Sequence, residues 1–211
     1  MNQDTIAAIS TGMTNSGIGI VRISGSEALE IADRVYKGKE TITEVPTHTI
    51  HYGHVMDGDE TVDEVLVMVM RGPRTFTGED TVEINCHGGT YVVSRVLETV
   101  LKAGARPAEP GEFTKRAFLN GKMDLSQAEA VIDVIQAKNE YALKSSLSQL
   151  KGSVLTSIKE IRSSILYHIA YIESALDDPE HISLDGYSEK LVQTVEEEKK
   201  KIRRLANSFD E

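Results

Sequence analysis

Two charged side chains interrupt strand-like segments of the sequence and are candidates for binding a polar ligand. Arg22 lies within residues 18–23, which are otherwise apolar or glycine, and Glu83 lies in a second strand-like run. Side chains alternate between the two faces of a strand, so Glu83 shares a face with Asn85 and His87. A carboxylate accepts hydrogen bonds and a guanidinium donates them, so such a face can hold a polar molecule. The alternative is a solvated face of an antiparallel sheet, which is common, and these residues alone favour it.

The sequence His87-Gly88-Gly89 then leads into a predicted helix. The free backbone N–H groups at a helix start favour an anion, so this position is a second candidate for binding.

A third candidate is the charged segment 110–125, which joins two halves of different character. It carries acidic and basic side chains around three large apolar residues, and Lys122 lies near its end. Ligand pockets often form at such junctions. The alternative is a linker that contains a short amphipathic helix.

Several familiar nucleotide, metal and nucleophile motifs are incomplete or missing. Gly12 and Gly17 have the phosphate-loop spacing, but Ile18-Gly19 stands where a lysine and a hydroxyl residue are required. Gly17 and Gly19 begin a dinucleotide motif, but Arg22 replaces its third glycine and the segment continues as a strand. No HExxH, CxxC or GxSxG pattern occurs. We therefore expect no catalytic residue, no nucleotide site and no metal site in this chain.

Composition predicts a folded protein of the cytoplasm. Hydrophobic residues make up 40% of the 211 residues and charged residues 27%, as in ordinary globular proteins. No apolar run approaches the ~20 residues that a membrane-spanning helix needs. The first residues do not resemble a signal peptide, and the single cysteine, Cys86, permits no internal disulfide.

The net charge of −10 disfavours direct binding of nucleic acid, which depends on basic residues that neutralise phosphates. A local basic patch is the open alternative, formed by Arg106, Lys115, Arg116 and Lys122.

Periodicity predicts mixed strands and helices in about the first 125 residues. We expect strands at 5–10, 18–24, 47–56, 65–70 and 82–87. We expect helices at 26–36, with Ser26 as the N-cap, and at 90–103.

The residues after Leu125 are predicted to be helical. Ser126 and Glu129 match a capping box that would open this region. Apolar residues then recur every three or four positions from Leu147 to Leu176, with only Gly152 between, and a last helix starts near Tyr187. Two amphipathic helices enclose little core, so we expect an incomplete antiparallel helical domain. The alternatives are an α-hairpin on the α/β domain or a coiled-coil arm.

A series of short motifs follows in order from the first strand to the start of the helical region. They are DTIAA at 4–8, GIVRISG at 19–25, FTGED at 76–80, Glu83 with HGG at 87–89, PGEF at 110–113, RAFLN at 116–120 and DLSQAEA at 124–130. In these motifs and their order the chain resembles the MnmE (TrmE) family of tRNA-modifying GTPases.

The resemblance implies an α+β domain at 1–120 that binds folate and dimerises, with the tetrahydrofolate-binding fold of the glycine-cleavage T protein. It implies that 121–211 are the first part of a helical domain, truncated before an inserted potassium-activated GTPase domain. GTP, Mg²⁺ and K⁺ would then bind only in that absent domain, and we expect no GTPase activity here.

The resemblance also implies a ligand and partners. Family members bind 5-formyl-tetrahydrofolate, standing in for methylene-tetrahydrofolate, at positions that match Arg22, Glu83 and Lys122. Glu83 suits the amino group and ring N–H of a pterin, and Arg22 or Lys122 suits the tail carboxylates. The family acts with the FAD-containing MnmG to place (carboxymethyl)aminomethyl groups on C5 of the tRNA wobble uridine. The expected partners are a second copy of the chain, MnmG and, mainly through that complex, tRNA, with no membrane.

Two other functions fit the same patterns. In the first alternative, the chain is a ligand-free dimerisation module. In the second, it is a stand-alone aminomethyltransferase, which the long helices disfavour.

Overall fold

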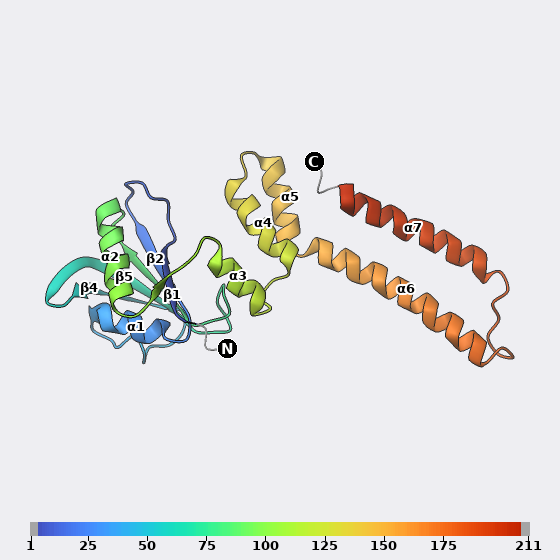
Figure 1. The fold of residues 1–211 in the computed structure, drawn as a ribbon, viewed down its shortest axis with the longest axis horizontal. Coiled ribbons are helices and arrows are strands. Elements are labelled where there is room, and N and C mark those ends of the chain that lie inside the picture. Colours follow the sequence, from blue (N-terminus) through green and yellow to red (C-terminus); the bar gives the residue numbers. More distant parts are fainter. Residues whose placement is uncertain (1–3, 208–211) are drawn as a thin grey trace. The chain divides into compact units, whose positions relative to one another are not determined.

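The computed structural model describes residues 4–207, apart from the side chain of Ser153, and divides the chain at Met123/Asp124 into two compact units. In the first unit, the described residues form a seven-stranded sheet in the order β3-β4-β5-β6-β2-β1-β7 (Figure 1). All neighbouring strands are antiparallel except β1 and β7, which are parallel. The strands are β1 (Ile6–Ile9), β2 (Gly19–Ser24), β3 (Tyr36–Gly38), β4 (Thr49–Asp57), β5 (Glu60–Met70), β6 (Thr81–Cys86) and β7 (Arg106–Pro107).

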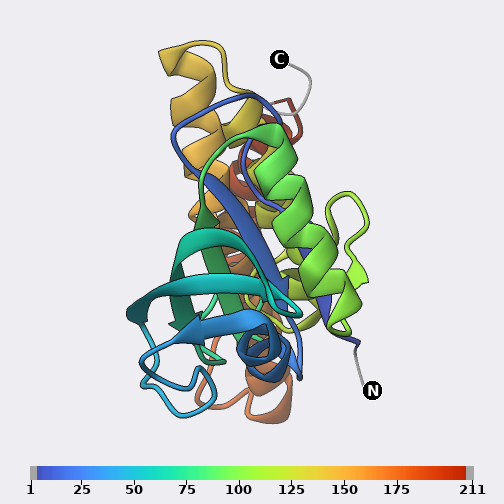
Figure 2. The same ribbon diagram turned by 90° about the vertical axis from the view of Figure 1, so that its left-hand side faces the viewer.

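Helices α1 (Ala28–Val35) and α2 (Thr90–Lys102) cover one face of this sheet (Figure 2). The core lies between them and the strands, because alternate strand residues such as Val21, Ile23 and Ile84 are completely buried. A third helix, α3 (Glu112–Leu119), follows β7. The predicted strands and helices of this unit are all present, although β5 begins five residues before the predicted start at Val65.

The sequence predicted Ser26 as the N-cap of α1, and this prediction is wrong. Glu27 occupies the N-cap position, and its side chain makes no capping hydrogen bond. The backbone N–H of Glu27 donates to Thr5 Oγ1 at 2.9 Å, which ties the start of α1 to the segment before β1.

In the second unit, the described residues form α4 (Leu125–Gln136), α5 (Glu140–Leu150), α6 (Ser153–Asp177) and α7 (Tyr187–Asn207). The predicted capping box at Ser126 and Glu129 is displaced by two residues. Asp124 is the N-cap, its carboxylate accepts from the backbone N–H of Gln127, and the Gln127 side chain accepts from the Asp124 N–H. Ser126 is already the second residue of the helix, so it is not the cap, and its hydroxyl donates to the Asp124 carboxylate.

The apolar stripe from Leu147 to Leu176 does not belong to one helix, as its periodicity predicts. Gly152 has a φ of +77° and separates α5 from α6. This left-handed conformation is readily adopted by glycine and ends the first helix.

Helices α6 and α7 run antiparallel and in contact, as Figure 1 shows. A groove of about 370 Å³ between them is lined mainly by apolar side chains, among them Ile165, Ile169, Val195 and Ile202. Each of these four side chains is about half exposed. No helix within the described residues is both long and apolar enough to cross a membrane.

Candidate functional site

Arg22 and Glu83, which the sequence singled out separately, form an ion pair. They lie directly opposite each other in the register of β2 and β6, on the sheet face away from α1 and α2. Arg22 donates from Nε and Nη2 to Glu83 Oε1, at 2.8 and 2.7 Å. Both side chains are largely buried, with 28% and 15% of their surface exposed. Among the described residues, Glu83 Oε2 makes no hydrogen bond, so this oxygen is available to a ligand.

Two phenylalanine rings flank the same guanidinium. The Cζ atom of Arg22 lies 5.8 Å from the ring centre of Phe76 and 5.6 Å from that of Phe113. Phe76 lies in the loop between β5 and β6, and Phe113 in the first turn of α3. Both distances are within the range of a favourable cation–π contact.

Lys122, the third predicted site residue, reaches the same β5–β6 loop. Its ammonium group donates to the Pro73 carbonyl at 2.7 Å, and its backbone N–H donates to the Ala117 carbonyl. The Lys122 stem packs against Gly78, where an added Cβ would lie 3.3 Å from the lysine Cγ and Cδ. Gly78 also has a φ of +81°, a backbone conformation that favours glycine, and the close lysine leaves little room for a Cβ.

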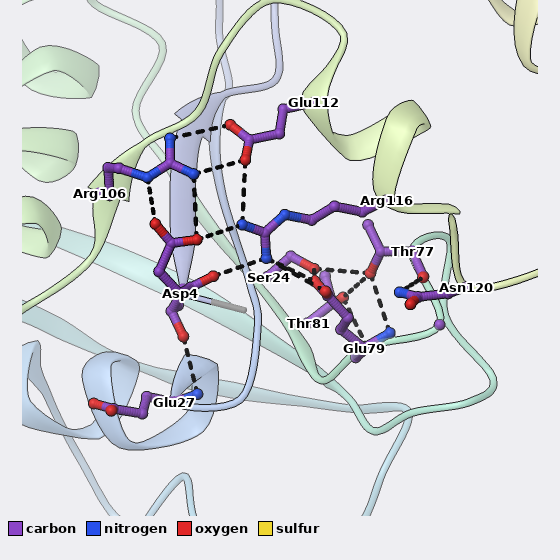
Figure 3. A network of polar contacts seen from close by, with 12 residues as sticks. Asp4, Ser24, Glu27, Thr77, Glu79, Thr81, Arg106, Glu112, Arg116 and Asn120 are labelled. Carbon is purple, nitrogen blue, oxygen red and sulfur yellow. Dashed lines mark hydrogen bonds and ion pairs between the residues drawn. The ribbon is translucent and has the colours of Figure 1, made fainter. Parts of the chain in front are cut away.

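A buried polar network fixes this loop and α3 (Figure 3). Arg116, with 5% of its side chain exposed, donates to the carboxylates of Glu79 at 3.3 Å and Glu112 at 3.2 Å. It also donates to the Asp4 carboxylate at 2.9 Å and the Asp4 carbonyl at 2.8 Å. Arg106 binds the other side of Glu112, with 2.7 Å between Nη2 and Oε1. Hydrogen bonds from Arg106, reinforced by the Glu109 N–H and Arg116, lower the pKa of Glu112 to about 2 against the opposing effect of burial.

Two further bonds connect this network to the sheet and the site. Ser24 on β2 donates to Glu79 at 2.8 Å, and the Asn120 side chain donates to the Thr77 carbonyl at 2.8 Å. The loop that carries Phe76 is thus held on both sides.

The network also bears on the basic patch that Arg106, Lys115, Arg116 and Lys122 were considered to form. Arg106 and Arg116 are occupied by carboxylates, so they are not free to neutralise phosphates as members of such a patch. One contact of the network has a local signal in the sequence, because Glu112 and Arg116 are four residues apart on a helix.

At the candidate anion site after His87, two backbone N–H groups already have acceptors within the protein. Asn15 accepts from the backbone N–H of Thr90 at the start of α2, at 3.4 Å. The Asp63 carboxylate accepts from the His87 backbone N–H and contacts its Nδ1 at 2.8 Å, which raises the pKa of the imidazole. Neighbouring Cys86 is buried, which raises the pKa of its thiol to about 11 and makes it a poor nucleophile at neutral pH.

The sheet face that carries Glu83 holds more apolar side chains than the predicted neighbours of Glu83 on that face, Asn85 and His87, indicated. A hollow of about 340 Å³ on it is lined by residues of β4, β5 and β6 and by the segment before β2. Ile18, Ile50, Tyr52 and Leu66 in this hollow are each about half exposed or more. Within residues 4–207, no three His, Cys, Asp or Glu side chains are grouped to hold a metal ion.

Comparison with known proteins gives two family matches that together cover almost the whole chain. Residues 5–122 match the model described as the N-terminus of the GTP-binding protein TrmE, and residues 125–211 match that of the MnmE helical domain. A tRNA modification GTPase MnmE from Lachnoclostridium phytofermentans is 58% identical over 213 aligned residues, and one from Staphylococcus aureus strain JH9 is 51% identical over 211. These alignments cover 100% and 99% of this chain and 46% of each relative, so the chain spans about half the length of the curated relatives it matches.

Proposed function

The chain belongs to the MnmE family of tRNA modification GTPases, and we propose that it is the part that binds tetrahydrofolate and dimerises. Residues 1–120 would form the folate-binding and dimerisation domain, with the fold of the glycine-cleavage T protein. Residues 121–211 would form the first part of the helical domain.

The Arg22–Glu83 ion pair is the observation that carries this proposal. A pterin presents an amino group beside a ring N–H, and a carboxylate accepts from both. Arg22 occupies only Oε1, so Glu83 retains Oε2 and further acceptor capacity on Oε1. The pair supports a division of roles in which Arg22 orients Glu83 while Glu83 binds the pterin.

Lys122 is then the cation for the glutamate tail of the folate. Its ammonium group has three N–H donors, and the Pro73 carbonyl takes one of them. The remaining donors suit a carboxylate, and Lys122 is free of any acidic partner among the described residues. Tetrahydrofolate, when bound, supplies the one-carbon unit, while these side chains bind and orient it.

The hollow sheet face supports dimerisation. Half-exposed Ile50, Tyr52 and Leu66 form an apolar surface on strands whose other face is already packed against helices. We expect Leu66→Glu to shift a dimer to monomer in light scattering, because it places a charge within the interface. Tyr91→Glu, on the exposed side of α2, is the matched control and leaves the dimer intact.

The remaining parts of the proposed function concern a partner protein and tRNA. We propose that the protein acts with the FAD-containing MnmG to install (carboxymethyl)aminomethyl groups at C5 of the wobble uridine, and that MnmG makes most of the tRNA contacts. The net charge of −10 and the pairing of Arg106 and Arg116 support this division.

The test is a calorimetric titration of the protein with 5-formyl-tetrahydrofolate. Glu83→Gln removes the charge that the pterin N–H groups meet, and a hydrogen bond to a charged group contributes about 1.5–3 kcal/mol. We therefore expect affinity to fall by about 10- to 150-fold. Glu30→Gln, an exposed position on α1, is the control and changes nothing. Equal affinity of Glu83→Gln and the unmodified protein would overturn the pterin assignment.

A further inference from the structure

We propose that Phe76 and Phe113 bind the p-aminobenzoyl ring of the folate, the arene between the pterin and the glutamate tail. This inference rests on the proposed function and adds two ligand-binding residues that the sequence motifs did not single out as a site.

The two rings come from separate segments but meet at one guanidinium. Phe76 lies in the β5–β6 loop and Phe113 on α3, and their ring centres lie 5.8 and 5.6 Å from Arg22 Cζ. Arg22 already faces Glu83, so the rings border the position assigned to the pterin.

Neither ring is needed to fill the hydrophobic core of the first unit. Phe76 keeps 39% of its surface exposed and Phe113 is half-buried, and both lie outside the core cluster beneath α1 and α2. Exposed aromatic side chains beside a polar binding group are typical ligand contacts, because a ring offers a flat apolar surface at a low cost in conformational entropy.

The rings are linked both to the Arg22–Glu83 pair and to the segments that hold Lys122. They contact Arg22, which pairs with Glu83. The loop that carries Phe76 also provides the Pro73 carbonyl and Gly78 that contact Lys122, and Lys122 follows the helix that carries Phe113 by three residues. A folate carries its arene between the hydrogen-bond donors of the pterin and the carboxylates of the tail, so we assign the rings to the arene.

The rings are also held in place before any ligand arrives. Arg116 joins α3 to the loop through Glu79, and Asn120 joins them through the Thr77 carbonyl. A pre-organised ring pair loses little entropy on binding, so its contacts contribute directly to affinity.

Two titrations of the same protein test this inference. One uses 5-formyl-tetrahydrofolate, and the other uses 6-methyltetrahydropterin, which has the pterin but no arene or tail. We expect Phe76→Leu and Phe113→Leu each to weaken the folate roughly three- to tenfold, because leucine keeps apolar volume but loses the ring face. Binding of the pterin is expected to remain unchanged.

Phe118→Leu is the matched control, because Phe118 is an exposed ring on the same helix and makes no contact with Arg22 among the described residues. It should leave both affinities unchanged. Equal weakening of folate and pterin by the Phe76 and Phe113 variants would overturn the inference and show that the rings act through the Arg22–Glu83 pair. Unchanged folate binding would overturn it too. Failure of the unmodified protein to bind either ligand would instead refute the proposed function.

Discussion

Replacing Arg116 with methionine removes the cation at the centre of the buried network and keeps most of the apolar volume of the side chain. The change leaves Glu79 and Glu112 largely buried, with 13% and 10% of their side chains exposed. Breaking a buried ion pair by removing one partner costs about 3–5 kcal/mol, because the remaining charge has lost its compensation.

The structure places the expected cost at the lower end of that range. Glu112 keeps its bonds to Arg106, so Glu79 is the carboxylate that loses its cation. Asp4 adds little, because its side chain is 57% exposed and exposed pairs contribute about 0–1 kcal/mol. We therefore expect Arg116→Met to lower the unfolding free energy of the first unit by about 3 kcal/mol.

Native-state amide hydrogen exchange measures this change within the first unit alone. Protected amides of β2, such as those of Val21 and Ile23, should exchange about 150-fold faster in the variant, since 1.4 kcal/mol corresponds to a factor of ten. The control is Arg34→Met, because the Arg34 side chain is 54% exposed and its ion pair with Glu27, at 3.9 Å, and its hydrogen bond to the Ala103 carbonyl both lie at the surface. A loss below about 1 kcal/mol for Arg116→Met would refute the view that the network depends on this arginine.

Three smaller changes test other parts of the structure. Gly78→Ala should weaken folate binding and lower the unfolding free energy by about 1–2 kcal/mol, because the φ of Gly78 is +81°. The control is Gly12→Ala, whose added Cβ meets no atom within 4 Å, so it should change neither quantity. Equal effects of the two variants in folate titration and urea unfolding would contradict this. The pKa of Glu112 is lowered from 4.5 to about 2, so its stabilising contribution is present above pH 4.5 and is lost as pH falls towards 2. Glu112→Gln should therefore flatten the pH dependence of unfolding in that window, and an unchanged slope would count against the network. Asp63→Asn should lower the pKa of His87 in an NMR titration, because the Asp63 carboxylate raises it, and an unaltered pKa would exclude that cause.

Local sequence patterns predicted the strands, most helices and the two-part organisation, because these depend on periodicity and on turn residues. These patterns gave wrong helix boundaries at two positions in the second unit. Ser126 looked like a helix cap, but Asp124 two residues earlier accepts the same kind of bond. The stripe through Gly152 looked continuous, because periodicity does not reveal a left-handed glycine.

The sequence indicated several residues of the candidate site but not how they lie relative to one another. Arg22 and Glu83 were each visible as charges in apolar strands, but their pairing depends on the register of β2 against β6, which connects positions 61 residues apart. Phe76 and Phe113 lie in the motifs at 76–80 and 110–113, but these motifs did not reveal their role, because a phenylalanine in a loop or helix looks the same whether it packs inward or faces a ligand. Their meeting at Arg22 follows only from the tertiary fold.

A crystal structure of this protein with 5-formyl-tetrahydrofolate would locate each group of the bound folate. We expect the pterin N–H groups within hydrogen-bond distance of Glu83, the p-aminobenzoyl ring against Phe76 and Phe113, and the tail carboxylates at Lys122. A folate bound elsewhere on the protein, or one with its tail at Glu83, would contradict this expectation.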